Sequence, residues 1–136
     1  MNSEFSVFVY ILSLLAINQN ERLTSSQISD RIHIHSARIR KVLGVMKRYG
    51  FVETKEGIAG GYILSKKPEN IHLKDVYTMV ESKPLQIPKR SLNEELSLPT
   101  TVDASLEYIF FSCEKQMLKH LEKIKLSDII EGGNLL

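Results

Sequence analysis

The sequence predicts a mainly α-helical chain with one small β-hairpin and a long helix toward its C-terminus. Apolar residues recur at three- and four-residue spacing in several separate stretches, which is the pattern of helices that pack on a core. Two short β-rich runs flank a glycine-rich segment within residues 51–65, which is typical of a hairpin. Helical periodicity sustained from about residue 101 to 125 predicts the long helix. With 136 residues, 43% of them apolar, the chain can bury one core.

The first predicted helix runs from Ser3 to about Asn18. It is apolar nearly all round, so we expect it to be covered on two sides, with another subunit as the second cover. Its apolar run, residues 5–17, follows Glu4 instead of a basic leader and is shorter than the ~20 residues that span a bilayer. We therefore expect a buried helix and no membrane segment. The stripe expected to face the core consists of Phe5, Phe8, Val9, Leu12, Leu15 and Ala16.

A helix-turn-helix is predicted over residues 23–49. Thr24 and Gln27 have the spacing of a capping box, which starts a short helix that ends near Ile32. A brief connection at residues 33–34 leads to a longer helix from Ser36 to about Tyr49, and Gly50 ends it. The side of this longer helix that we expect to face the core carries Ile39, Val42, Leu43, Met46 and Tyr49.

The segment after Gly50 is predicted to form a hairpin, the wing of a winged helix. Its strands lie within residues 51–55 and 62–65, and the glycines between them permit positive φ angles in a tight turn. The same glycines lack the Lys-Ser/Thr pair of a P-loop and do not open a helix, which argues against a nucleotide site. Pro68 closes the hairpin, and a short helix is expected over residues 73–81.

The C-terminal part is predicted to pair two chains. Residues 82–100 contain three prolines and little periodicity, so they are expected to form a linker. The helix after it, about 101–125, would extend ~37 Å at 1.5 Å per residue, beyond a small domain, and is expected to pack on its twin. A brief turn and a glycine-terminated tail complete the unit 101–136. The apolar stripe of the long helix consists of Val102, Leu106, Ile109, Phe110, Cys113, Met117, Leu121 and Ile124.

Charge divides the chain into a basic and an acidic part. Residues 20–67 hold ten Lys/Arg against four Asp/Glu, a net charge of +6, whereas the remaining residues carry −4. This division is typical of a polyanion-binding unit joined to an assembly unit. We therefore expect residues 1–81 to be a DNA-binding domain and double-stranded DNA to be its partner.

The helix over 36–49 supplies the candidate DNA contacts. In a helix-turn-helix the second helix enters the major groove with its first turns near the base edges. We expect base contacts from Ser36, Ala37, Arg40 and Lys41, phosphate contacts from Arg38, Lys47 and Arg48, and a backbone or minor-groove contact from Lys55 in the wing. The alternative is that these cations form a solvated helix face and do not contact DNA. The capped helix before this helix and the hairpin after it favour DNA binding over that alternative.

The sequence gives little support for catalysis or metal binding. We expect that the protein is not an enzyme, because the sequence suggests neither a nucleophile with an oriented base nor paired carboxylates in a pocket. We expect no metal, because Cys113 and His120 supply two ligands of the three or four needed. A single cysteine forms no intrachain disulfide and fits a reducing cytoplasm. Cys113 is a packed residue of the long helix or, alternatively, a redox sensor.

Several motifs resemble the Rrf-two family of bacterial winged-helix regulators. The run Gly57-Ile58-Ala59-Gly60-Gly61-Tyr62-Ile63-Leu64, followed by Pro68, Ile71, Leu73 and Asp75-Val76, is similar to the family pattern G-x-x-G-G-Y-x-L…P-x-x-I-x-L-x-D-V. Arg40-Lys41-Val42-Leu43-Gly44, with Lys47, Gly50 and Val52, resembles its recognition helix. The match covers residues 3–81 well and the tail 125–129 more loosely. The family includes an iron–sulfur cluster regulator and a cysteine-metabolism repressor, and this chain resembles its cysteine-poor branch.

The resemblance implies a homodimer that places one basic helix per subunit in successive major grooves of a palindrome. Cluster-binding members have three cysteines before the long helix, whereas residues 82–105 contain none, so we expect no iron–sulfur cluster. His35-Ser36 stands where the branch often has Asn-Pro, and Glu56 stands where many members have arginine. A carboxylate at residue 56 repels phosphate, so a contact between the wing and DNA depends on Lys55.

The sequence thus favours a sequence-specific DNA-binding regulator, expected to be a repressor, with an effector that it does not identify. The alternative is a winged-helix module that binds another protein and no DNA. Salt separates the two, because phosphate contacts make log K fall by about 0.9 per neutralised phosphate with log[salt].

Overall fold

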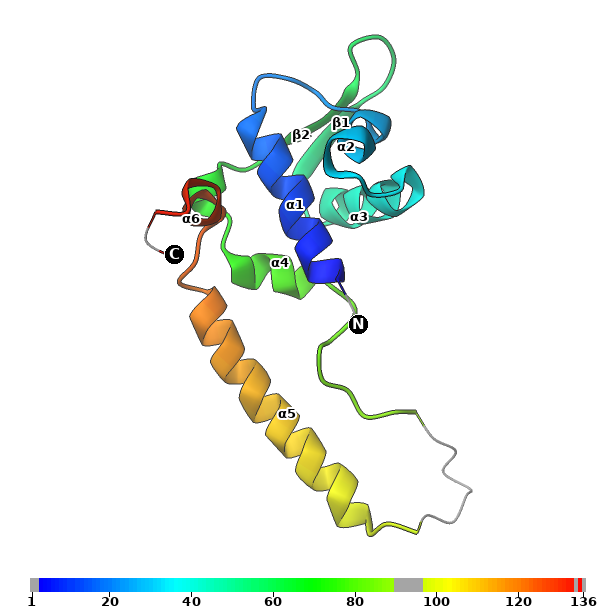
Figure 1. Cartoon of the computed structure of the whole chain (residues 1–136), viewed down its shortest axis with the longest axis vertical. Helices are drawn as coiled ribbons and strands as arrows, with labels where there is room; N and C mark the ends of the chain where they lie inside the picture. The colour runs from blue at the N-terminus through cyan, green and yellow to red at the C-terminus, as the bar shows by residue number, and fades with distance from the viewer. Residues whose placement is uncertain (1–2, 90–96, 134, 136) are drawn as a thin grey trace.

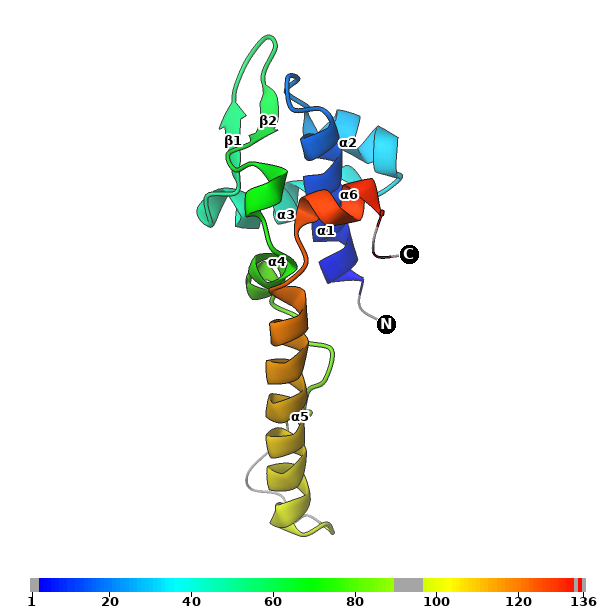
Figure 2. The same ribbon diagram turned by 90° about the vertical axis from the view of Figure 1, so that its left-hand side faces the viewer.

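The computed structural model describes residues 3–89, 97–133 and 135. It confirms a mainly helical fold with one antiparallel two-stranded hairpin. Most helices form a compact body around α1 (Glu4–Ile17), the hairpin projects from one end of that body, and α5 (Thr100–Leu121) extends from the other (Figure 1). The view turned by 90° shows the same order, with the hairpin and α5 pointing in opposite directions (Figure 2).

The helix α1 lies at the centre of the core. Its buried residues are on more than one side, because α2, α3, α4, α6 and the strand β2 all contact it. The predicted stripe was therefore too narrow: Val7 and Ile11 are also buried, whereas Phe5 and Val9 are only half-buried. The second cover comes from elements of the same chain, including α6 and β2, and does not require another subunit.

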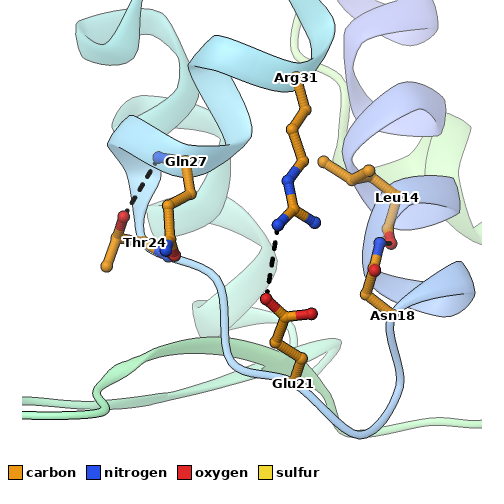
Figure 3. Close-up of polar contacts among 6 residues, drawn as sticks. All are labelled: Leu14, Asn18, Glu21, Thr24, Gln27 and Arg31. Atoms are coloured by element: carbon orange, nitrogen blue, oxygen red, sulfur yellow. Dashed lines mark hydrogen bonds and ion pairs between the residues drawn. The ribbon is translucent and has the colours of Figure 1, made fainter.

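The helix α2 (Ser25–Ile32) begins at the predicted capping box. Thr24 Oγ1 accepts a 3.1 Å hydrogen bond from the Gln27 amide, and Gln27 Oε1 accepts a 2.9 Å bond from the Thr24 amide. Together they satisfy two amides that a helix start leaves without partners. Figure 3 shows this box beside two contacts of the preceding turn, Asn18 Nδ2 to the Leu14 carbonyl (2.8 Å) and Arg31 to Glu21 (3.4 Å).

The hairpin consists of β1 (Val52–Lys55) and β2 (Gly61–Leu64), paired from Val52–Leu64 to Lys55–Gly61. An additional bridge fastens it to the turn before α2, since Tyr62 and Leu23 exchange two backbone hydrogen bonds of 2.7 and 3.1 Å. Gly61 permits this approach: it has φ +128°, and a Cβ there would lie 2.6 Å from the Leu23 carbonyl carbon. The base of the wing is therefore fixed to the helical body.

After the hairpin, the 3-10 turn η1 (Pro68–Asn70) leads to α4 (Leu73–Met79). This helix ends two residues earlier than predicted, because Val80 adopts an extended backbone and is itself buried. The last helix, α6 (Leu126–Glu131), forms where only a brief turn was expected, and it returns to the body. Leu126 is completely buried and its amide donates to the Ile71 carbonyl at 2.8 Å.

The helix α5 begins at Thr100 and ends at Leu121, four residues before the predicted end, because residues 122–125 turn back toward η1 and α4. None of its described residues is buried. The predicted apolar stripe splits in two. Phe110, Met117 and Leu121 lie beside pockets shared with α4 and the segment after it, whereas Val102, Leu106 and Ile109 remain exposed. The described parts of the expected linker, residues 82–89 and 97–99, contain no helix or strand; residues 90–96 lie outside the described chain.

Candidate nucleic-acid interface

The helix-turn-helix is formed by α2 and α3 (Ser36–Arg48), which pack on each other across a three-residue connection. His33 makes this short turn possible by taking the left-handed conformation at φ 56°. The hydroxyl group of Ser29 in α2 donates a hydrogen bond of 2.5 Å to the Ile34 carbonyl, which holds the connection against α2. The relative placement of the two helices is therefore set by local contacts.

The start of α3 is capped by His35. Its Nδ1 atom accepts a 3.1 Å hydrogen bond from the Ala37 amide. A backbone amide can only donate, so Nδ1 is the acceptor in this hydrogen bond. The helix starts at Ser36 as predicted, with the side chain of His35 as its cap.

The inner side of α3 anchors it to the core, with two differences from the prediction. Ile39, Val42, Leu43 and Met46 are buried as expected. Val45 is buried too, whereas Tyr49 was wrongly placed in the core: its side chain is 51% exposed, because it lies in the turn after the last helical residue. The core thus fixes the helix by its middle turns and leaves both ends at the surface.

The outer side of α3 carries the predicted contact residues. Ala37, Arg38, Arg40, Lys41, Lys47 and Arg48 are exposed, and Ser36 is half-buried. These residues include five cations: Arg38, Arg40, Lys41, Lys47 and Arg48. An exposed helix surface with five cations can attract phosphates and place guanidinium or ammonium groups in a groove.

Arg38 differs from the other cations of α3. Its Nη2 atom donates a 2.9 Å hydrogen bond to Ser3 Oγ just before α1. It also lines a hollow of about 250 Å³ together with Lys41 and Arg48, and the carboxylates of Glu4 and Glu81 border the same hollow. The cations therefore divide into a group beside α1 and a second group, Arg40 and Lys47, on the side away from it.

The wing places Lys55 at the end of β1, exposed and paired in the ladder with Gly61. Glu53 and Glu56 are exposed on the same hairpin, so carboxylates outnumber ammonium groups there. One nearby cation was missed by the sequence analysis: Arg22 donates to the Gly61 carbonyl at 3.4 Å, at the base of the wing. No local pattern signals it, since its place depends on the Leu23–Tyr62 bridge between distant segments.

Cys113 is exposed on α5, far along the chain from the cationic helix. It borders a pocket of about 130 Å³ that also includes Tyr77 and Glu114. The redox role of Cys113 stays a prediction. Among the described residues, no three His, Cys, Asp or Glu side chains come together as metal ligands, and no helix has the length and apolar character needed to cross a membrane.

Comparison with known proteins agrees with this geometry. The model of the Rrf2 (Rrf-two) family, described as an iron-dependent transcriptional regulator, matches residues 1–132. YwnA of Bacillus subtilis (strain 168), whose name places it among HTH-type transcriptional regulators, is 25% identical over 131 residues, which cover 96% of each chain.

Two solved structures share the fold. T. potens IscR superposes with a TM-score of 0.72 at 18% identity, covering 98% of this chain and 88% of the other. CymR (YrzC), named as the global cysteine regulator of B. subtilis, gives a TM-score of 0.67 at 17% identity and covers 98% of both chains. These structures confirm the winged-helix fold.

The donor set of this chain does not fit an iron–sulfur cluster. Iron–sulfur clusters are held by four protein ligands, most of them cysteine thiolates. The sequence contains one cysteine in all, Cys113, and it is exposed on α5. One thiolate per chain is too few for such a cluster.

Proposed function

The chain belongs to the Rrf2 family of transcriptional regulators, and from this premise we propose that it is a homodimeric repressor that binds a palindromic DNA operator through α3. The observation that carries the proposal is the exposed outer side of α3, where five cations lie on a helix whose inner side is buried. The first turn, with Ser36, Ala37, Arg40 and Lys41, would read base edges.

The remaining cations would bind the DNA backbone. Lys47 lies in the last turn of α3, away from the base-reading turn, where a phosphate contact supplies affinity without sequence information. Arg48 and Arg38 would contact phosphates on the side that faces α1. Lys55 would add a contact from the wing, which Glu53 and Glu56 keep weak because like charges repel.

The homodimer is supported by the exposed apolar surface of α5. Val102, Leu106 and Ile109 lie along one stripe of a helix that projects from the body and has no buried residue of its own. Contiguous apolar surface of this kind is a common feature of subunit interfaces. Two-fold pairing through α5 would present two copies of α3 to two half-sites, since operator symmetry mirrors protein symmetry.

Selection of bound fragments from a random DNA library by the purified protein tests the proposal. We expect an enriched sequence with two-fold symmetry, bound with a steep fall of log K against log[salt]. A protein-binding module without DNA function would enrich no sequence, and equal affinity for all fragments at physiological salt would contradict sequence-specific recognition. Reporter expression with the operator placed in a promoter then separates a repressor from an activator.

The same assay tests a thiol switch at Cys113. If the exposed thiol senses oxidants, peroxide will change the operator affinity of the wild type and leave Cys113→Ser unaffected. Equal affinities in all four samples would exclude this role.

A further inference from the structure

The apex of the wing carries an apolar side chain that touches almost nothing. Ile58 is 99% exposed, and it lies in the loop between β1 and β2. Single exposed apolar residues are common on protein surfaces, so exposure alone identifies no site. The position and the support of Ile58 are what set it apart.

The loop that presents Ile58 has a fixed backbone. The Gly60 amide donates a 3.0 Å hydrogen bond to the Gly57 carbonyl, which closes a tight turn around Ile58 and Ala59. Gly57 and Ala59 both have positive φ angles, 88° and 59°. At the other end of the hairpin, the Leu23–Tyr62 bridge fastens β2 to the body. The hairpin therefore holds Ile58 at a fixed position away from the helical body.

The charge of the wing does not suit phosphate binding. Its exposed charged side chains are Glu53, Lys55 and Glu56, a net charge of −1, in contrast to the five cations on the outer side of α3. A contact between this hairpin and DNA consequently gains little from ionic attraction. The apolar side chain at the apex is the group that can make a favourable contact.

The length of the hairpin matches the spacing of DNA grooves. β1 begins three residues after Tyr49, the residue that follows α3, and Ile58 lies six positions beyond Val52. At ~3.3 Å per residue, the apex lies about 20 Å along the hairpin from the start of β1. Adjacent grooves are separated by about 17 Å, half of the ~34 Å helical turn. With α3 in the major groove, the apex can reach the neighbouring minor groove.

We propose that Ile58 enters the minor groove beside the bases contacted by α3 and makes a purely apolar contact there. The inference rests on the proposed DNA-binding function. Apolar side chains can insert in the minor groove and contact its walls. The guanine N2 amino group projects into that groove, whereas A·T pairs leave it open. Ile58 therefore favours A·T pairs at the positions under the wing, through fit and without a charge contact.

Base-pair substitution at those positions tests the proposal. In the fragment selected by the wild type, the A·T pairs under the wing are replaced by G·C or by inosine·C, which has a G·C-like major groove but lacks the N2 amino group. We expect G·C to lower wild-type affinity by about tenfold, within the usual cost of one mismatched pair, and inosine·C to leave it nearly unchanged.

Variants of the apex complete the test. Ile58→Ala should bind the A·T fragment about fivefold to tenfold more weakly, because its contact area is smaller, and should lose most of the discrimination. The slope of log K against log[salt] should not change, because no phosphate contact is lost. Ile58→Val should retain most of the affinity. Ile17→Ala, the same truncation at an exposed isoleucine of α1, is the matched control and should bind as the wild type does.

The outcomes separate the two proposals. Unchanged affinity in Ile58→Ala, or inosine·C pairs that behave like G·C pairs, would overturn the role of Ile58 while sequence-specific binding by α3 stands. Failure of the wild type to enrich any sequence would instead overturn the proposed function itself.

Discussion

The hydroxyl group of Tyr77 in α4 donates a 2.8 Å hydrogen bond to the carboxylate of Glu114 in α5. The ring of Tyr77 is buried, at 6% exposure, and packs against Phe5 at the start of α1 with the ring centroids 6.4 Å apart. The Nζ atom of Lys83, in the segment after α4, lies over the ring of Tyr77 at 4.3 Å from its centroid. Tyr77 therefore joins three parts of the chain at the point where the projecting helix meets the body.

Because of this contact, we expect the free energy of unfolding to fall at alkaline pH. Burial, together with the adjacent Glu114 carboxylate, raises the pKa of Tyr77 from 10.0 to about 12. The folded state favours the protonated phenol. The stabilisation that the Tyr77–Glu114 hydrogen bond gives to the folded state is therefore fully present below pH 10 and is lost as pH rises toward 12. Tyr77→Phe keeps the ring and removes the hydrogen bond, so it should lower the free energy of unfolding by about 1 kcal/mol near neutral pH.

Denaturant unfolding of both proteins from neutral to alkaline pH measures this effect. The difference between wild type and Tyr77→Phe should shrink between pH 10 and pH 12. A difference that stays constant over this range would show that the hydroxyl group does not carry the contact.

Two Gly→Ala substitutions, one in the wing and one in α3, should change the stability of the protein in opposite directions. Gly61→Ala should destabilise the protein by about 2–4 kcal/mol, because the new Cβ would overlap the Leu23 backbone and φ +128° is strained for alanine. Gly44→Ala, in the middle of α3 with open space around it, should stabilise it by about 0.5–1 kcal/mol. Thermal unfolding of the pair checks both signs, and a tolerant Gly61→Ala would refute the close Leu23–Tyr62 bridge.

The exposed stripe of α5 predicts the response of the dimer to charge. Ile109→Glu should weaken self-association by at least about tenfold, because each two-fold interface would bury two unpaired carboxylates. Ala104→Glu adds the same charge to an exposed position outside the stripe and serves as the control. Sedimentation velocity over a concentration series measures both. A dimer that survives Ile109→Glu and dissociates with Ala104→Glu would place the interface on another face.

The sequence predicted the elements whose signals are local. The capping box of α2, the start of α3 and the turn of the wing each depend on residues within four positions of one another, and all three form as predicted. The inner side of α3 followed from its periodicity with two exceptions. Val45 is buried although the predicted stripe omitted it, and Tyr49 is exposed because the helix ends before it and periodicity no longer applies.

Contacts between distant segments were not predictable in this way. The return of α6 buries Leu126 beside α1, and the Leu23–Tyr62 bridge brings Arg22 to the base of the wing. Both depend on how separate elements pack, which no short pattern encodes. The cationic residues of α3 were identifiable by spacing, but the link of Arg38 to Ser3 and the hollow beside α1 required the fold.

The central claim is that the outer side of α3 reads DNA sequence, and a comparison of Arg40→Ala with Lys47→Ala tests it most directly. Affinities are measured for the selected operator and for variants with single base-pair changes. Arg40→Ala should lose ~1–3 kcal/mol on the operator and become indifferent to one base pair, whereas Lys47→Ala should weaken all fragments alike and reduce the salt slope by about 1. Equal operator affinity in wild type and both variants would contradict recognition by α3.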